Sequence, residues 1–377
     1  MKPTRIVLLI AMALLIAAPT IVTALGGARL YPGQVIDENR YRAEAPAFDV
    51  DAMMARDGAW SGEWTAYYDD RFGPRDLFIR AKNQIDYSAF HYSSGLFFDH
   101  EDNMYYRSVV AQQQPLNESM SDEAVDQQVE LYRRIEAACR KKGVSLSIII
   151  APQKNTVYQT EGLPVLRPTP NRYERMTQRL QEEVPDSFVD VLPALREANE
   201  VEHVFFRSDF HWNDYGAAVA FREVTRAIAA KEGVSVTEPE LRFVDLPGYQ
   251  GDQMSNLSVF FPPVDNAITV EGDAPMNYVL EPIEEPYRGH WRNEGVAPLE
   301  GTAVFVGDSF TPPALFDFHG TSSKLQNLFS ETYYVHWNDA EGMLDRLPEG
   351  TRYVIIESTE SGIYHRDEAL VRLVPEE

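Results

Sequence analysis

Apolar strands that alternate with amphipathic helices constrain the fold of this chain more than any other feature. Beyond Ser121 a helical spacing of apolar residues is followed by a continuous apolar run at residues 144–150. A strand that is apolar throughout is expected where helices cover both faces of a sheet. Further strands are expected at 187–192, 302–306, 332–335 and 352–357. This alternation predicts an α/β fold with a doubly wound, mostly parallel sheet.

Capping residues indicate where the helices between these strands begin and end. Ser121 is suited to cap a helix that runs to Gly143. Residues 170–184 repeat the helical spacing, and residues 213–231 form another apolar-faced helix with Gly233 just past its end. These signals define an α/β domain that spans residues 121–377.

Two regions do not share the alternation. Residues 28–120 are rich in aromatic side chains and contain Gly95 before a short apolar strand. We expect them to form an N-terminal segment that packs on the α/β domain. Residues 236–300 are rich in proline, glycine and acidic residues, with little periodicity. We interpret that stretch as an insertion that could cover a site as a lid.

The N-terminus predicts export from the cytoplasm. Lys2 and Arg5 precede an uncharged run from Ile6 to Ala28. A basic start followed by an apolar stretch is typical of an export signal, and a run of about 20 residues is long enough to span a bilayer. Residues 1–27 therefore form a cleaved signal peptide or a retained signal-anchor, of which we favour the anchor. The rest of the chain is then periplasmic or at the cell surface.

The charge balance excludes one class of partner. The 377 residues carry 34 Lys+Arg against 58 Asp+Glu, a formal net charge of -24. A nucleic-acid binder needs a basic face, so this balance argues against nucleic acid. It also argues against a densely anionic polymer as partner, unless a local arginine-lined groove holds it.

Cysteine and metal-ligand patterns are sparse. Cys139 is the only cysteine and lies among apolar residues, which indicates a buried small side chain more than a nucleophile. The adjacent residues Asp99, His100, Glu101 and Asp102 could form a metal cluster, but such runs are more often solvated turns. We expect no metal ion and no cofactor.

Two short motifs contain the residue types of serine-based acyl chemistry. Gly307-Asp308-Ser309 follows an apolar strand, at the strand end where open α/β sheets bind ligands. Asp209 and His211 lie two residues apart in a loop before a helix start. A serine nucleophile needs a base within hydrogen-bond reach, and that base needs an orienting acceptor. Each motif alone also fits an ordinary loop or a capped helix, but together they are far more specific.

The two motifs resemble the nucleophile block and the acid–base block of SGNH-type esterases and acetyltransferases. Their order is reversed here, which a circular permutation would explain. With this order and Asp209-Phe210-His211-Trp212, the chain resembles the periplasmic alginate O-acetyltransferase group and the related Asp-His-His-Trp exopolysaccharide proteins. Further matching segments are 38–40, 68–75, 95–98 and 151–158.

The resemblance implies roles for individual residues. Ser309 would be the acyl nucleophile, His211 the base and Asp209 its orienter. SGNH enzymes carry an oxyanion-donating asparagine where this chain has residues 356–360, Ile-Glu-Ser-Thr-Glu, so that donor is unassigned.

Further side chains are weaker candidates for the site. Asn338 and His336 could supply the donor but could equally be surface residues. Trp212 and Tyr158 could line a sugar site or pack in the core, and Lys154 could face the same sheet edge or be solvated.

The function implied is O-acetylation of an exported polysaccharide through an acetyl-serine. Such proteins work beside a multi-spanning membrane acyltransferase of the MBOAT type that supplies acetyl groups. Given the charge of -24, a neutral or weakly charged polysaccharide fits better than alginate. A secreted carbohydrate esterase and a non-catalytic polysaccharide-binding assembly factor remain alternatives, because water could replace the acceptor and because the expected asparagine is missing.

Overall fold

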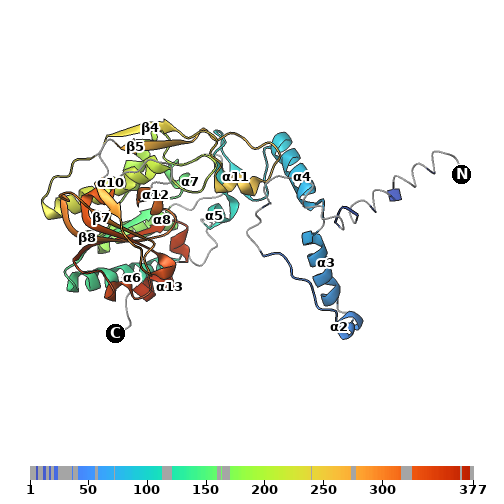
Figure 1. Cartoon of the computed structure of the whole chain (residues 1–377), viewed down its shortest axis with the longest axis horizontal. Coiled ribbons are helices and arrows are strands. Elements are labelled where there is room, and N and C mark those ends of the chain that lie inside the picture. The colour runs from blue at the N-terminus through green and yellow to red at the C-terminus, as the bar shows by residue number, and fades with distance from the viewer. Residues whose placement is uncertain are drawn as a thin grey trace. The chain divides into compact units, whose positions relative to one another are not determined.

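The computed structural model in Figure 1 describes most of the chain beyond residue 40. The described residues are 41–55, 58–71, 73–112, 121–158, 163, 170–238, 240–272, 277–315, 325–365 and 367–373, with isolated positions before residue 41. Most of the predicted export segment and the matching residues 38–40 lie outside this set. None of the described helices is both long enough and apolar enough to cross a membrane.

Contacts divide the chain into two units. The helical unit contains residues 1–96 and 254–263, and the sheet unit contains residues 97–253 and 264–377. The boundaries predicted at residues 27 and 120, and the packing of 28–120 on the α/β domain, stay predictions.

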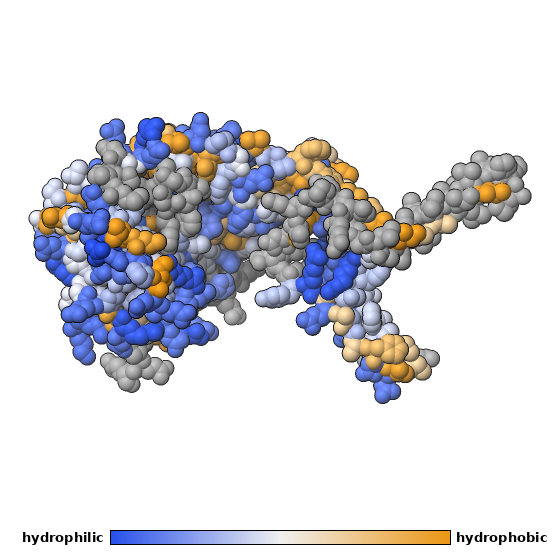
Figure 2. Space-filling view, viewed as in Figure 1, coloured by the Kyte–Doolittle hydropathy of each residue, from blue (hydrophilic) through white to orange (hydrophobic). Residues whose placement is uncertain are grey.

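The helical unit contains α2 (Val50–Met54), α3 (Ala59–Arg71) and α4 (Arg75–Phe90). Within this unit α4 holds the segment that returns at 254–263, since Gln84 Oε1 accepts hydrogen bonds from the N–H groups of Phe260 and Phe261 at 3.1 and 2.9 Å. Figure 2 shows apolar colouring over α4, whose exposed apolar side chains are Leu77, Phe78, Ile85 and Phe90.

The sheet unit is built on a six-stranded sheet with the order β3-β10-β8-β9-β7-β6. Four neighbouring strands are parallel: β3 (Ser145–Ala151), β10 (Thr351–Thr359), β8 (Leu299–Gly307) and β9 (Phe329–His336). The antiparallel strands β7 (Gly289–Asn293) and β6 (Tyr278–Leu280) complete one edge. The predicted α/β class and mostly parallel sheet are confirmed.

Alternate residues of the parallel strands enter two hydrophobic cores. Ile148 and Ile356 enter one core, whereas their neighbours Ile149 and Ile355 enter the other. The first core is covered by α6 (Asp122–Lys141), α8 (Arg172–Glu183) and α13 (Asp367–Leu373), and the second by α9 (Leu192–Asn199) and α10 (Asp214–Glu232). Helices therefore cover both faces, which is why the central residues of β3, β8 and β10 are apolar.

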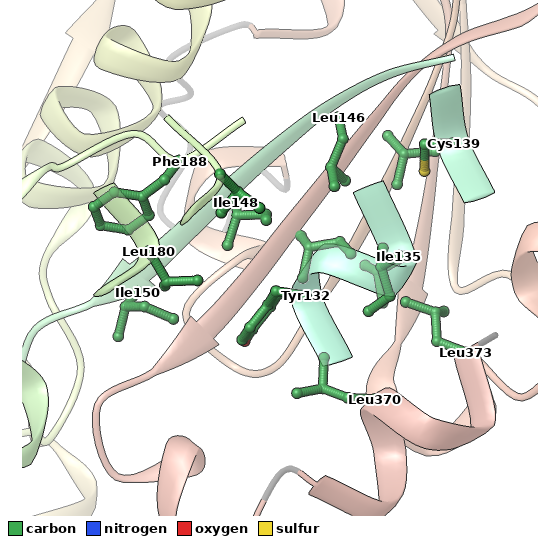
Figure 3. Packing of buried hydrophobic residues seen from close by; sticks show 14 of the residues in the cluster. Tyr132, Ile135, Cys139, Leu146, Ile148, Ile150, Leu180, Phe188, Leu370 and Leu373 are labelled. Carbon is green, nitrogen blue, oxygen red and sulfur yellow. The ribbon is translucent and has the colours of Figure 1, made fainter. Parts of the chain in front are cut away.

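Cys139 belongs to the first core. Figure 3 shows it on α6 among the apolar side chains that pack on β3. Its side chain is buried, and burial together with the charge of Glu136 raises the pKa of the thiol to about 12. A thiol held protonated in this way is a small apolar side chain, not a nucleophile.

The helix ends follow the capping signals. Ser121 Oγ accepts a hydrogen bond from the N–H of Ala124 at 3.1 Å at the start of α6. Asn213 Oδ1 accepts from the N–H of Gly216 at 2.9 Å at the start of α10. Gly143 and Gly233 end these two helices with φ of 71° and 67°, in the left-handed region that glycine adopts without strain.

The structure differs from the sequence-based expectation at residues 187–192. Only a single bridge, between Phe188 and Ile148, lies in the predicted strand. The segment is too short to continue, because Asp190 Oδ1 accepts a hydrogen bond from the N–H of Leu192 and α9 begins there.

Residues 236–300 contain more regular structure than their composition indicated. β4 (Leu241–Asp245) pairs with β5 (Ile268–Gly272), α11 (Asp252–Leu257) lies between them in sequence, and β6 and β7 join the main sheet. This stretch therefore adds strands to the fold as well as the segment that contains Tyr249 and the start of α11.

Candidate active site

Ser309 lies in the turn that follows β8, at the carboxyl end of the central parallel strands. Its side chain is exposed, whereas Asp308 and Phe310 on either side are buried. Glu357 Oε2, at the end of β10, accepts hydrogen bonds from the N–H of Asp308 and from Thr311 Oγ1, both at 3.0 Å. The turn is thus fixed to the neighbouring strand while its serine faces outward.

Gly307 is required for this arrangement. A Cβ at this position would lie 1.9 Å from Thr311 Oγ1 and 2.8 Å from Glu357 Oε2. The two side chains that fix the turn therefore occupy the space that any other residue would need. This explains in physical terms why a glycine precedes Asp308 and Ser309.

The loop that carries His211 is closed on itself and tied to the serine turn. Phe205 and Trp212 form an antiparallel bridge at its ends, and Asn213 then caps α10. The Nε1–H of Trp212 donates to the carbonyl of Phe310 at 2.9 Å. This bond joins the loop of the base directly to the residue after Ser309.

The three residues of the predicted triad lie in hydrogen-bond contact. His211 Nε2 is 2.8 Å from Ser309 Oγ, and His211 Nδ1 is 2.6 Å from Asp209 Oδ1. Because Asp209 accepts at Nδ1–H, Nε2 is left as the acceptor for the serine hydroxyl. Asp209 Oδ1 also accepts from the backbone N–H of His211 at 2.9 Å, which fixes the carboxylate relative to the ring.

Burial and charge set the protonation states of this pair. Burial raises the pKa of Asp209, but the hydrogen bonds and charge of His211 outweigh it and hold that pKa well below its usual range. Burial lowers the pKa of His211, but the hydrogen bond and charge of Asp209 outweigh it. The charges of Asp252 and Asp308 add to this, so the pKa of His211 lies above its ordinary value. Asp209 is therefore ionised, and the site stabilises an imidazolium.

The second oxygen of Asp209 is held by residues that sequence reasoning missed. Asp209 Oδ2 accepts from the hydroxyl of Tyr249 at 2.7 Å and from the N–H of Asp252 at 3.2 Å. Burial and the charge of Asp209 raise the pKa of Tyr249, so its hydroxyl stays protonated and donates. The ring of Tyr249 stacks on Phe206 with centroids 4.2 Å apart.

Gly251, in the same segment, was the one sequence feature that could have indicated this contact. A Cβ at Gly251 would lie 2.3 Å from the carbonyl oxygen of Ser208 and 2.6 Å from Cβ of Asp209. Glycine marks a close approach of backbone segments. The sequence Gly-Tyr-Gln-Gly-Asp at 248–252 therefore indicated contact with another part of the chain, but not which part.

We expect Tyr249→Phe to lower kcat about 10-fold without changing KM, since a hydrogen bond to a charged group contributes about 1.5 kcal/mol or more. The reason is the loss of the hydroxyl that holds Asp209 Oδ2. Ester hydrolysis per titrated active site is the measurement. Tyr287→Phe is the matched control, because that hydroxyl donates to the carbonyl of Arg346 at 3.2 Å instead. An unchanged kcat for Tyr249→Phe would show that Tyr249 does not position the triad.

Of the aromatic candidates for a sugar site, Trp212 lies inside the second hydrophobic core and Tyr158 is partly buried against that core. Trp212 is fully buried and lies against Phe310 and Phe221. The hydroxyl of Tyr158 accepts from the N–H of Phe205 at 3.2 Å, and its ring contacts the same residue edge-on. These contacts support the core-packing alternative for both residues.

The two polar candidates, Lys154 and Asn338, lie in different surroundings. Lys154 is only 3% exposed, so the alternative in which it is a solvated lysine is wrong. Asn338 is exposed after β9, and its backbone N–H donates to His336 Nδ1 at 3.2 Å. Within the described part of the chain, no hydrogen bond joins the Asn338 side chain to the triad.

The stretch at residues 356–360, where the resemblance implied an asparagine, points inward. Glu357, Ser358 and Glu360 are all buried. Glu360 accepts from the N–H of Gln153 at 2.8 Å and so joins β10 to the end of β3. By contrast, the backbone N–H of Ser309 has no acceptor among the residues that the structure describes. A backbone N–H without an acceptor is chemically able to donate to an oxyanion.

One cluster has the residue types of a metal site. Asp209, His211 and Asp252 offer ligand atoms that lie within 4.8 Å of one another. These atoms already serve the triad, since Asp209 Oδ1 binds His211 and Asp252 Oδ1 accepts from the N–H of Phe210 at 3.1 Å. A cation here would compete with the pair that orients the base.

The other metal candidate of the sequence, residues 99–102, forms a hydrogen-bonded turn. Asp99 accepts from the N–H groups of Glu101 and Asn103, both at 2.9 Å, and from the hydroxyl of Tyr105 at 2.6 Å. The carboxylate is used to shape the turn, which supports the turn alternative.

Comparison with known proteins connects this site to a family. Residues 101–350 match the family model described as "SGNH hydrolase-like domain, acetyltransferase AlgX". The probable alginate O-acetylase AlgJ of Pseudomonas fluorescens is 25% identical over 265 residues, which cover 68% of this chain and 61% of that protein. The AlgJ of Pseudomonas syringae pv. tomato is 25% identical over 216 residues, or 54% of this chain and 51% of the relative.

The matched region spans only between half and two thirds of these relatives. Among solved structures, Bacillus cereus PatB1 with a sulfonyl adduct superposes with a TM-score of 0.54 at 10% identity, over 74% of this chain and 97% of PatB1. At this identity the likeness supports the fold alone.

Proposed function

This chain belongs to the family whose model is described as "SGNH hydrolase-like domain, acetyltransferase AlgX", and from that premise we propose that it O-acetylates an exported polysaccharide through an acetyl-serine. The observation that carries the proposal is the 2.8 Å contact between His211 Nε2 and the exposed Ser309 Oγ. A nucleophile in contact with an oriented base is the arrangement that acyl transfer requires.

In the first half-reaction, Ser309 Oγ attacks the carbonyl carbon of the acetyl donor while His211 Nε2 takes the hydroxyl proton. The carbonyl oxygen becomes an oxyanion, to which the backbone N–H of Ser309 can donate because it has no acceptor among the described residues. Collapse of this intermediate breaks the bond to the leaving group, which receives the proton from His211. Acetyl-Ser309 remains.

In the second half-reaction, a sugar hydroxyl gives its proton to His211 Nε2 and its oxygen attacks the acetyl carbon. Collapse returns the proton to Ser309 Oγ and releases the acetylated sugar. Asp209, held ionised, stabilises the imidazolium that forms in both halves.

A circular permutation of the SGNH fold is part of the proposal. Counting strands from β8, the strand that leads to Ser309, the sheet order β9-β8-β10-β3 becomes 2-1-3-4. The bridge of Phe188 to Ile148 in β3 marks where a fifth strand would lie. This is the order of flavodoxin-like doubly wound sheets, started part-way through the chain.

The polysaccharide that accepts the acetyl group and the source of that group are proposed only as chemical classes. The relatives carry the name alginate O-acetylase, but the charge of -24 favours a neutral or weakly charged polysaccharide here. The N-terminal signal or anchor would place the protein in the periplasm or at the cell surface. A multi-spanning membrane acyltransferase would then supply acetyl groups.

A carbohydrate esterase is the second candidate, and one observation favours it. The side chain of Ser309 is exposed, so water can reach an acetyl-serine as readily as a sugar can. Transfer then depends on how well the acceptor excludes water.

The test is product analysis with p-nitrophenyl acetate as donor, with neutral oligosaccharides, with alginate oligosaccharides and without acceptor. We expect acetylated neutral oligosaccharide to exceed free acetate when that acceptor saturates. Free acetate alone under every condition would instead assign the protein as an esterase.

A further inference from the structure

Lys154 is a buried cation beside the triad that the acyl-transfer mechanism does not use. It is the first residue of α7 (Lys154–Val157), directly after β3. The start of this helix is fixed to β10, since Glu360 accepts hydrogen bonds from the N–H of Gln153 at 2.8 Å and from Thr156 Oγ1 at 3.0 Å. The lysine side chain therefore extends from a rigid base.

All three hydrogens of the Lys154 ammonium have protein acceptors. Nζ donates to the carbonyl of Met104 at 3.0 Å, to the carbonyl of Arg207 at 3.2 Å and to Gln253 Oε1 at 3.5 Å. An ammonium group has three donors and no acceptor. A Lys154 bonded in this way has none left for a sugar hydroxyl.

Two of these acceptors belong to segments that contain Asp209 or bind its carboxylate. Arg207 comes two residues before Asp209, and Gln253 follows Asp252, whose N–H donates to Asp209 Oδ2. The N–H of Met104 also donates to the carbonyl of Arg207 at 2.9 Å, so the third acceptor belongs to the same junction. Lys154 thus joins the segments on both sides of Asp209.

The surroundings of Lys154 can stabilise its buried positive charge. Burial lowers its pKa to about 8, against the charges of Asp209, Asp265, Asp252 and Asp99, which raise it. Hydrogen bonds and opposite charges nearby both offset the cost of burying a charge, and here three acceptors supply the first and the charges of four carboxylates the second.

We propose that Lys154 is a positioning residue that fixes Asp209, and through it His211, by joining the 207–211 loop to Gln253. This inference rests on the proposed acyl-transfer function and deepens it. It replaces the expectation that Lys154 binds substrate. The two roles differ in which half-reaction they affect, because formation of acetyl-Ser309 needs the triad but no sugar.

The test compares Lys154→Met with wild type in both half-reactions. Release of p-nitrophenol from p-nitrophenyl acetate, per active site titrated with a fluorophosphonate, should fall about 100-fold, the loss typical of a misplacement of about 1 Å. The KM for the oligosaccharide acceptor should be unchanged. Wild-type p-nitrophenol release with a raised acceptor KM would overturn the proposal and make Lys154 an acceptor ligand.

Lys231→Met is the matched control. Lys231 also donates to a backbone carbonyl, that of Leu146 at 3.4 Å, but it is exposed and lies at the end of α10 away from the triad loop. We expect this variant to keep the wild-type rate per active site. If Lys154→Met does not fold, Gln253→Leu removes one acceptor only and should slow p-nitrophenol release in the same way by a smaller factor; no slowing would overturn the proposal.

Hydrogen exchange measured by mass spectrometry tests the positioning independently of activity. Peptides that contain residues 207–211 should exchange faster in Lys154→Met than in wild type, and Lys231→Met should not show this. Unchanged exchange would contradict the proposal even if activity changed. Wild-type protein that releases no p-nitrophenol through Ser309 would instead refute the proposed function and leave the exchange result to decide the role of Lys154.

Discussion

Replacement of Ser309 by alanine is expected to abolish acetyl transfer, with a loss in kcat of about 10⁴-fold or more, as for the nucleophile of other triads. The physical reason is that the variant has no oxygen 2.8 Å from His211 Nε2 to attack the donor. The fold should be unaffected, because the Ser309 side chain is exposed and its only hydrogen bond to a described residue is that with His211.

The measurement is acetyl transfer together with labelling by a fluorophosphonate, which reacts with activated serines. Wild type should be labelled and Ser309→Ala should not. Ser330→Ala is the matched control, since Ser330 is also exposed and accepts from the N–H of Gly301 at 3.1 Å. Labelling of Ser309→Ala at the wild-type level would place the nucleophile elsewhere. Absence of labelling in wild type would favour the non-catalytic alternative.

Asp209→Asn should lower kcat about 10⁴-fold, the loss seen when a triad aspartate is replaced in this way. The amide can donate to Nδ1 of His211 and so favours the tautomer that presents a hydrogen, not a lone pair, to Ser309. The pH dependence should change as well. His211 acts as base only when neutral, so activity is lost as pH falls through its pKa, which Asp209 raises. Without that charge the acid limb should move to lower pH.

The pH–rate profile of kcat/KM for the two proteins is the check on this prediction. Asp345→Asn serves as control, because Asp345 is a surface residue paired with Lys142 at 3.1 Å. An acid limb that stays in place in Asp209→Asn, or that moves to higher pH, would contradict the assignment of Asp209 as the group that raises the pKa of His211.

The parts of the fold predicted from sequence are those that local chemistry determines. β3, β8 and β10 are buried on both faces along most of their length, so their apolar runs were visible, whereas β9 was predicted only over 332–335. Ser121, Asn213 and Gly233 act within one turn of their own helix. The contact of Asp209, His211 and Ser309 could be predicted because both motifs lie at strand or helix ends, where parallel strands bring side chains together.

The parts that escaped prediction depend on partners distant in sequence. Strand β7, which lies between β9 and the edge strand β6, contains His290 and Arg292 and shows no apolar run. Tyr249 lies forty residues from Asp209, in a segment without periodicity. Lys154 reads as a surface residue because its acceptors at 104, 207 and 253 come from three separate segments.

Mass spectrometry of the peptide that contains Ser309 tests the central claim most directly. Wild-type protein quenched during turnover of an acetyl donor should carry one acetyl group on Ser309, and this group should disappear when a saccharide acceptor is added. Turnover that continues with no acetyl group on Ser309, or with acetyl on another residue that is lost at the rate of turnover, would contradict the account.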